Sequence, residues 1–128
     1  MSDKPNKVVE INGIDEFNNL TEKNLKTPIV IDFWAPWCGP CKAFKPVFEK
    51  AFEEWGNYFI FARVNTESNP AIAQQLGIMG VPTIGFVKGN KLIQSVSGGL
   101  RKGAFDKLLT RVKQNIENEG RNVSRMYS

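Results

Sequence analysis

The sequence has no histidine and only two cysteines, Cys38 and Cys41. A structural zinc site needs about four Cys, His or carboxylate ligands, and an iron–sulfur cluster has a similar requirement. Two cysteines supply half of such a set, so a metal centre would need ligands from a second chain. We therefore expect no metal and no bound cofactor.

Long apolar segments are also missing. No apolar run approaches the roughly 20 residues that a membrane-spanning helix needs. Residues 1–7 lack the apolar region of a signal peptide, and Asp3, Glu10, Asp15 and Glu16 argue against an acid-poor transit peptide. We expect a cytoplasmic protein without a membrane partner. The length of 128 residues fits one domain that can bury a core without metal or disulfide staples.

The net charge of +4 lies entirely in the last 28 residues. Residues 1–100 carry ten basic and ten acidic side chains, whereas residues 101–128 carry seven basic and three acidic ones. A site for single-stranded nucleic acid combines basic residues with aromatic side chains on which bases stack. Here the basic residues are spread along a predicted amphipathic helix and a polar tail. We favour a solvated charged face over a nucleic-acid site.

Strand and helix signals alternate along the chain. Strands are predicted at residues 8–11, 29–34, 58–65, 83–87 and 92–96, and helices at residues 15–23, 42–56, 71–76 and from about 101. The apolar run 29–34 is typical of a central parallel strand, and the short turn 88–91 predicts an antiparallel hairpin. This order predicts an α/β fold with a mixed sheet of about five strands flanked by about four helices. The domain is expected at residues 1–117, and residues 118–128 are expected to form a frayed polar tail.

The two cysteines stand in the stretch Trp37-Cys38-Gly39-Pro40-Cys41-Lys42, between the apolar strand and a helix. A disulfide here closes a loop of only four residues and stabilises the fold by roughly 2 kcal/mol, which makes it a poor staple. At a helix start, unpaired backbone N–H groups favour the Cys38 thiolate. Cys41 lies one turn further on, close enough to attack a mixed disulfide at Cys38. We therefore favour a redox-active pair over a structural disulfide.

Asp32 interrupts the apolar strand at residues 29–34. A buried, unpaired carboxylate is costly, so burial should raise the pKa of Asp32. An acid poised near neutral pH can take the proton of Cys41 when this thiol must attack. The alternative is a structural aspartate whose oxygens are satisfied by hydrogen bonds near the end of the strand.

The stretch Ile31-Asp32-Phe33-Trp34-Ala35-Pro36-Trp37-Cys38-Gly39-Pro40-Cys41-Lys42 is followed along the chain by Pro46, Val81-Pro82-Thr83 and Gly98. With these residues in this order and spacing, over about residues 8–117, the chain resembles the thioredoxin family. The resemblance implies a thioredoxin-like fold and a protein-disulfide reductase. Cys38 would be the attacking thiol, Cys41 the resolving thiol and Asp32 the buried acid behind Cys41.

The resemblance also implies a substrate-binding surface. Pro82 would be a cis proline packed against the cysteines, and the Val81 backbone would bond to a bound substrate strand. The shallow apolar docking surface would be outlined by Trp37, Gly39, Pro40, Val81 and Gly98. Trp34 is assigned to the core.

For partners, the resemblance implies disulfide-containing proteins and a thioredoxin reductase that draws on NADPH. A monomer is expected. Two alternatives stay open: an oxidant or isomerase of the same fold, and a binding or scaffold subunit in which redox chemistry is incidental. The sequence also departs from the family at Arg63, where many members have a lysine near the buried acid. Arginine is permanently charged and cannot share a titration, so the coupling around Asp32 is expected to differ.

Overall fold

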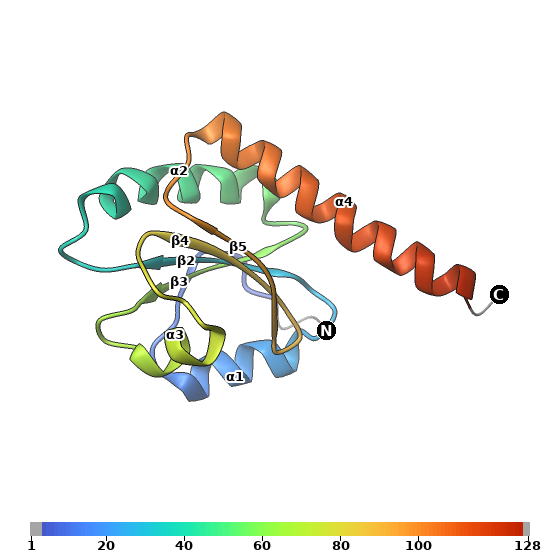
Figure 1. The fold of residues 1–128 in the computed structure, drawn as a ribbon, viewed down its shortest axis with the longest axis horizontal. Coiled ribbons are helices and arrows are strands. Elements are labelled where there is room, and N and C mark those ends of the chain that lie inside the picture. The colour runs from blue at the N-terminus through green and yellow to red at the C-terminus, as the bar shows by residue number, and fades with distance from the viewer. Residues whose placement is uncertain (1–3, 127–128) are drawn as a thin grey trace.

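The computed structural model describes the backbone of residues 4–126 and the side chains of residues 4–120. The elements follow the order β1 (Val9–Glu10), α1 (Ile14–Lys23), β2 (Ile29–Trp34), α2 (Gly39–Trp55), β3 (Ile60–Asn65), α3 (Pro70–Leu76), β4 (Thr83–Lys88), β5 (Lys91–Ser97) and α4 (Lys102–Met126) (Figure 1). This is the predicted order of strands and helices.

The strands form one five-stranded sheet in the order β1-β3-β2-β4-β5. Strands β1, β3 and β2 run parallel, whereas β4 is antiparallel to both β2 and β5. The predicted mixed sheet is therefore confirmed. Strand β2 is central, and in its register Asp32 pairs with Arg63 of β3 and Ile84 of β4.

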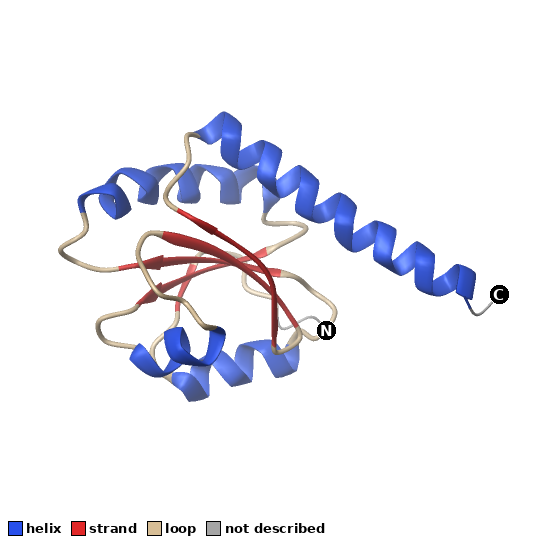
Figure 2. Ribbon diagram, viewed as in Figure 1, coloured by secondary structure: helices blue, strands red, loops and turns tan. Residues whose placement is uncertain are grey.

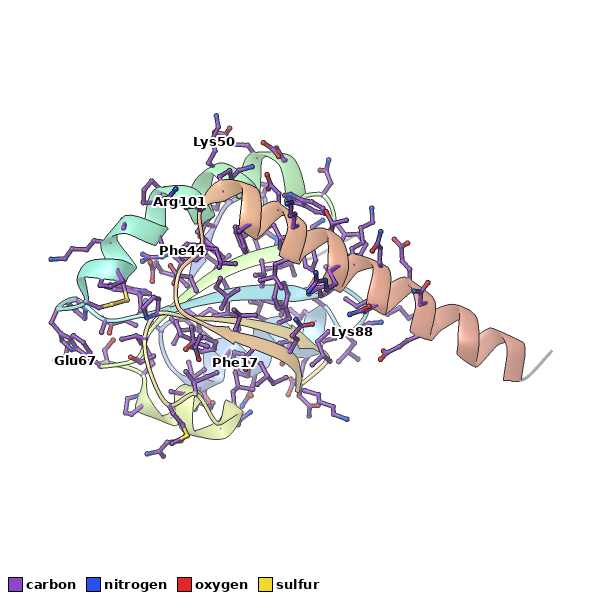
Figure 3. The ribbon with its side chains drawn as sticks, turned by 45° about the horizontal axis from the view of Figure 1, so that its top comes forward. Phe17, Phe44, Lys50, Glu67, Lys88 and Arg101 are labelled. Atoms are coloured by element: carbon purple, nitrogen blue, oxygen red, sulfur yellow. A yellow bond between two sulfur atoms is a disulfide. The ribbon has the colours of Figure 1, made fainter. Side chains whose placement is uncertain are left out.

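Helices cover both faces of the sheet, with α2 and α4 on one face and α1 and α3 on the other (Figure 2). Successive strand residues point to opposite faces, so Val30 packs with α2 and α4 while Ile29 and Ile31 pack with α1 and α3. Phe44 and Phe17, both labelled in Figure 3, belong to these two separate cores. Burial on both faces explains why β2 has a nearly continuous apolar sequence.

Some element boundaries differ from the prediction. Helix α2 begins at Gly39, three residues before the predicted start at 42, because Cys38 already acts as its N-cap. Strand β3 begins at Ile60 rather than at 58, because the N–H groups of Tyr58 and Phe59 donate to the Trp55 carbonyl at the end of α2.

Helix α4 continues through the predicted tail as far as Met126. Among the residues whose side chains are described, Ile116 is the last apolar residue of α4 that packs against the core, and beyond it α4 extends away from the sheet (Figure 1). The domain boundary at residue 117 and the fraying of the tail stay predictions; residues 1–3 and 127–128 lie outside the described part. Within residues 4–126, no helix is both long enough and apolar enough to cross a bilayer.

Candidate active site

Cys38 and Cys41 form a disulfide at the start of α2, drawn as a yellow bond in Figure 3. Their Cα atoms lie 5.3 Å apart. Cys38 is the N-cap of the helix, and its sulfur accepts a hydrogen bond from the Cys41 N–H at 3.2 Å. Pro40 lies in the first turn, where its missing N–H leaves no helical bond unmade.

This local geometry stabilises negative charge on one sulfur in particular. In the reduced protein, the same Cys41 N–H and the positive end of the helix dipole can stabilise a thiolate at Cys38. Cys38 is 4% exposed and Cys41 1% exposed, so a partner disulfide has better access to Cys38. The helix start therefore makes the two sulfurs unequal: Cys38 is the N-cap, and Cys41 is slightly more buried within the first turn.

One side of the disulfide carries an exposed apolar rim. Trp37 is 71% exposed and Met79 is 99% exposed. Both side chains line a shallow hollow of about 200 Å³ whose other lining residues are Thr66, Ile78, Gly80 and Val81. The resemblance implies Trp37 and Val81 as parts of this surface but not Met79, and the exposure of a single methionine in a loop leaves no periodic signal in the sequence.

A second shallow hollow of about 250 Å³ lies between the first turns of α2 and the segment that precedes α4. It is lined by Pro40, Ala43, Phe44, Val47, Gly99, Leu100 and Arg101. Gly39 lies at the first helical position, and a side-chain carbon built there would meet no atom within 4 Å. No internal packing therefore requires glycine at this position, which leaves room for a partner to approach.

The loop before β4 joins this rim from across the fold. The Val81–Pro82 peptide bond is cis, as the resemblance implies. Val81 packs against the cluster formed by Ala35, Cys38 and Cys41. Gly98, at φ +93°, donates its N–H to the Pro82 carbonyl at 2.8 Å. The structure thus brings Val81, Pro82 and Gly98 together with the cysteine helix.

Asp32 is completely buried on β2, and its two oxygens differ. Oδ2 accepts a hydrogen bond from Arg63 Nε at 3.0 Å, whereas Oδ1 receives none from the described residues. Burial raises the pKa of Asp32, the bond and charge of Arg63 oppose this rise, and the charge of Glu10 adds to it. The structure therefore combines both interpretations: one oxygen is satisfied, and the other is not.

Arg63 connects this acid to its surroundings. Its Nη1 donates to Glu10 Oε1 at 2.7 Å, and its guanidinium carbon lies 4.5 Å from the centre of the Trp34 ring. Trp34 in turn packs against the cluster of Ala35, Cys38 and Cys41. The sequence indicates that Arg63 lies near the acid but does not identify Glu10, whose place depends on the pairing of β1 with β3.

The described residues contain no cluster of three or more His, Cys, Asp or Glu side chains that could hold a metal ion. The groups that the structure brings together here are the two sulfurs, with the buried Asp32 carboxyl and its Arg63–Glu10 pair on the neighbouring strands.

Comparison with known proteins places the chain in a family. The family model described as Thioredoxin matches residues 8–111. A thioredoxin of Chlorobaculum thiosulfatiphilum is 38% identical over 99 residues, which cover 72% of this chain and 92% of that protein. The chloroplastic M-type thioredoxin of Zea mays is 33% identical over 105 residues, 77% of this chain but only 63% of that longer protein.

Solved structures agree. A thioredoxin of Malassezia sympodialis has 35% identity and a TM-score of 0.75, covering 84% of this chain and 92% of that one. A thioredoxin of Fasciola hepatica has 28% identity and a TM-score of 0.74, covering 81% and 98%. Since the sequence match spans the sheet, the helix that carries the disulfide and the cis-proline loop, this chain belongs to the thioredoxin family.

Proposed function

We propose that this chain is a general protein-disulfide reductase that works by dithiol–disulfide exchange. One observation carries the proposal: the disulfide lies at the N-terminus of α2, where Cys38 Sγ accepts the Cys41 N–H. In the reduced protein, a thiol in this position ionises readily to a thiolate, and the second sulfur lies within bonding distance of it.

The first step is attack on the target. The Cys38 thiolate attacks one sulfur of the target disulfide, the target S–S bond breaks, and a Cys38–target mixed disulfide forms. The released target sulfur leaves as a thiolate and takes a proton from solvent. The hydrogen bond from the Cys41 N–H stabilises the attacking thiolate before the step.

The second step releases the target. Cys41 gives its thiol proton to Asp32, and the free oxygen Oδ1 is the available acceptor because Oδ2 is held by Arg63. The Cys41 thiolate then attacks Cys38 Sγ, and the bond to the target breaks. The second target sulfur leaves as a thiolate and takes a proton from solvent, and Asp32 returns its proton to solvent. The target gains two electrons as dithiol, and the Cys38–Cys41 disulfide forms, which is the state of this structure.

The position of Asp32 supports this role. Val30, Asp32 and Trp34 alternate with the residues of the α1–α3 core, so they share the face of β2 that α2 covers. Cys41 is a buried residue of α2. The acid on β2 and the resolving thiol on α2 therefore belong to the facing sides of one buried layer, which supports a proton transfer between them.

Targets are proposed to dock across the two hollows. Trp37, Gly39, Pro40, Val81, Pro82 and Gly98 outline the surface around Cys38. Extended substrate can bond to the Val81 backbone and place its disulfide over the sulfur. An open, shallow surface of this kind suits many targets better than one shaped ligand.

Recycling and location belong to the same proposal. A thioredoxin reductase would return two electrons from NADPH to the Cys38–Cys41 disulfide, so the chain itself needs no bound cofactor. We place the chain in the cytoplasm, where thiols are kept reduced, and as a monomer. Some relatives are chloroplastic by name, so a tagged full-length chain should be followed in cells.

The test is reduction of insulin disulfides with NADPH and a thioredoxin reductase. Wild type should turn over, and Cys38→Ser should not, because the attacking sulfur is gone. Absence of turnover in the wild type would overturn the proposal. Titration against glutathione distinguishes the oxidant alternative, which requires a pair more oxidising than the glutathione pool. A cellular role that survives Cys38→Ser would instead indicate a scaffold.

A further inference from the structure

The buried acid is linked to the protein surface by a row of three charged side chains. Glu10, Arg63 and Asp32 lie on β1, β3 and β2, and Arg63 is the strand partner of both carboxylates. Strand partners point to the same face of a sheet, here the face covered by α2 and α4. The row ends at Glu10, whose side chain is 47% exposed.

The Arg63 guanidinium bonds to both carboxylates through two different nitrogen atoms. Arg63 uses Nε for Asp32 at 3.0 Å and Nη1 for Glu10 at 2.7 Å, so the shorter bond goes to Glu10. The planar guanidinium also lies over the Trp34 ring, with 4.5 Å between the guanidinium carbon and the centre of the ring. One permanent positive charge therefore serves two carboxylates and cannot move freely towards either of them.

This division matters for the resolving step. A carboxylate that had Arg63 to itself would be a weaker base, because an adjacent cation stabilises the ionised form. Glu10 competes with Asp32 for hydrogen bonds from the Arg63 guanidinium. The negative charge of Glu10 also opposes ionisation of Asp32. A stronger base takes the Cys41 proton more readily.

We propose that Glu10 is a positioning residue for the proton transfer that precedes resolution: it shares Arg63 with Asp32 and keeps the Asp32 carboxylate basic enough to accept the proton at Oδ1. Glu10 acts through Arg63 and touches neither sulfur nor target. This inference rests on the proposed function and adds a second, surface-accessible residue to it.

Few other charges face Asp32. Strand β3 contributes Arg63 and β1 contributes Glu10, and among the described residues these two charged side chains act on the pKa of Asp32. Helix α2 contributes the titratable thiols of Cys38 and Cys41 once the disulfide is reduced. Strand β4 places the uncharged Ile84 beside Asp32. The effect of a substitution at Glu10 on the titration of Asp32 can therefore be measured with few other charged groups contributing to it.

The test uses the full chain with Glu10→Gln, and Glu22→Gln as the matched control on the exposed face of α1. Titration of the Asp32 carboxyl carbon by NMR in the reduced protein should show a midpoint at lower pH in Glu10→Gln only. Stopped-flow resolution of a preformed Cys38 mixed disulfide should be about two- to fivefold slower at pH 8. High salt should shrink both differences, because Glu10 is half-exposed.

A second variant separates a path through Arg63 from a simple effect of charge. In an Arg63→Lys background, a single ammonium cannot bridge two carboxylates in a fixed plane, so Glu10→Gln should have a clearly smaller effect, limited to the direct charge of Glu10. An equal effect in both backgrounds would overturn the inference, as would an unchanged Asp32 midpoint in Glu10→Gln. A purely structural role would lower the free energy of unfolding without moving that midpoint.

Failure here can be told from failure of the proposed function. If wild type reduces insulin and Asp32→Asn slows resolution, but Glu10→Gln matches wild type, only the role of Glu10 is lost. If Asp32→Asn also resolves at the wild-type rate, Asp32 is not the base, and the roles of Asp32 and Glu10 are both lost while the reductase activity stands. Only a wild type that does not reduce insulin overturns the proposed function itself.

Discussion

At the scale of single residues, the site depends on a carboxyl group with unequal surroundings. A buried Asp32 with two satisfied oxygens would be a structural anion, and one with none would stay protonated. Arg63 satisfies Oδ2 and leaves Oδ1 without a donor among the described residues. The group is thus held in place while one oxygen stays available for a proton, which is what a recurring acid–base role requires.

Asp32→Asn should stabilise the fold and slow catalysis. Because burial raises the pKa of Asp32, the native state holds its proton at a higher pH than the unfolded chain does. Wild-type stability should therefore fall as pH rises from the unfolded value of about 4 through the raised native value. Urea unfolding of the oxidised proteins should be measured from pH 4 to 9. The free energy of unfolding of Asp32→Asn should rise relative to that of wild type as the pH increases over that range.

The same variant should resolve a mixed disulfide at least about tenfold more slowly than wild type at pH 7. The rate of the first attack serves as the control. It is measured separately by adding Cys41→Ser to wild type and to Asp32→Asn, and it should differ little between the two. A stability difference that stays constant across the whole pH range would contradict the raised pKa.

At the scale of elements, loops decide what reaches the sulfur. Helix α2 places Cys38 at its N-cap, and the loop before β4 places Val81 beside it. The exposed side chain of Trp37 comes from the loop between β2 and α2, and that of Met79 from the loop before β4. Together they line one hollow. Large apolar groups left in water beside a reactive atom are typical of a binding surface.

Met79→Ser should weaken docking without affecting the fold. The side chain is 99% exposed, so its loss should change the free energy of unfolding by less than about 0.5 kcal/mol. The KM for a protein disulfide should rise about two- to fivefold while kcat holds, because the lost contact is remote from the reacting sulfurs. Steady-state insulin reduction measures both constants.

Leu25→Ser is the matched control for Met79→Ser. Leu25 is also an exposed apolar residue, but it precedes β2, whereas Cys38 follows it. A KM change of the same size in Leu25→Ser would show that general surface apolarity, rather than the rim, is responsible.

The end of α4 gives an element-scale test of the domain boundary. The α2–α4 core uses Leu109 and Val112 and, at its margin, Ile116. Deletion of residues 118–128 should therefore leave insulin reduction unchanged and cost less than about 1 kcal/mol of stability, whereas Leu109→Ala should cost about 2–5 kcal/mol. Chemical unfolding measures both, and a large loss on truncation would place the boundary further along the chain.

At the scale of the whole molecule, the redox site is separate from what holds the fold together. Two apolar cores, one on each face of the sheet, account for most of the buried side chains. The disulfide closes a loop of only four residues at the edge of this structure. The protein can therefore cycle between dithiol and disulfide without unfolding.

The oxidised form should be more stable than the reduced form by roughly 2 kcal/mol, since the loop is short. Urea unfolding with and without a strong reductant measures the difference, and circular dichroism should show the same secondary structure in both forms at low denaturant. The Cys38→Ser/Cys41→Ser double variant controls for the reductant and should be insensitive to it. Loss of structure on reduction would mean that the disulfide is a structural staple after all.

Features encoded over short stretches were readable from the sequence alone. The cysteine pair at a strand-to-helix junction, the central apolar strand with its single Asp32, and the order of elements all depend on neighbours within a few residues. Their patterns carry a local physical signal: burial of both faces, unpaired N–H groups at a helix start, and proline at a first turn.

The tertiary structure alone decided what lies beside these features. Pairing of β1 with β3 set Glu10 against Arg63, and the fold brought Gly98 to the Pro82 carbonyl. It also left the Met79 side chain exposed. Such contacts join residues far apart in the chain, so no local pattern can encode them; they exist because a packed sheet brings distant strands into one register.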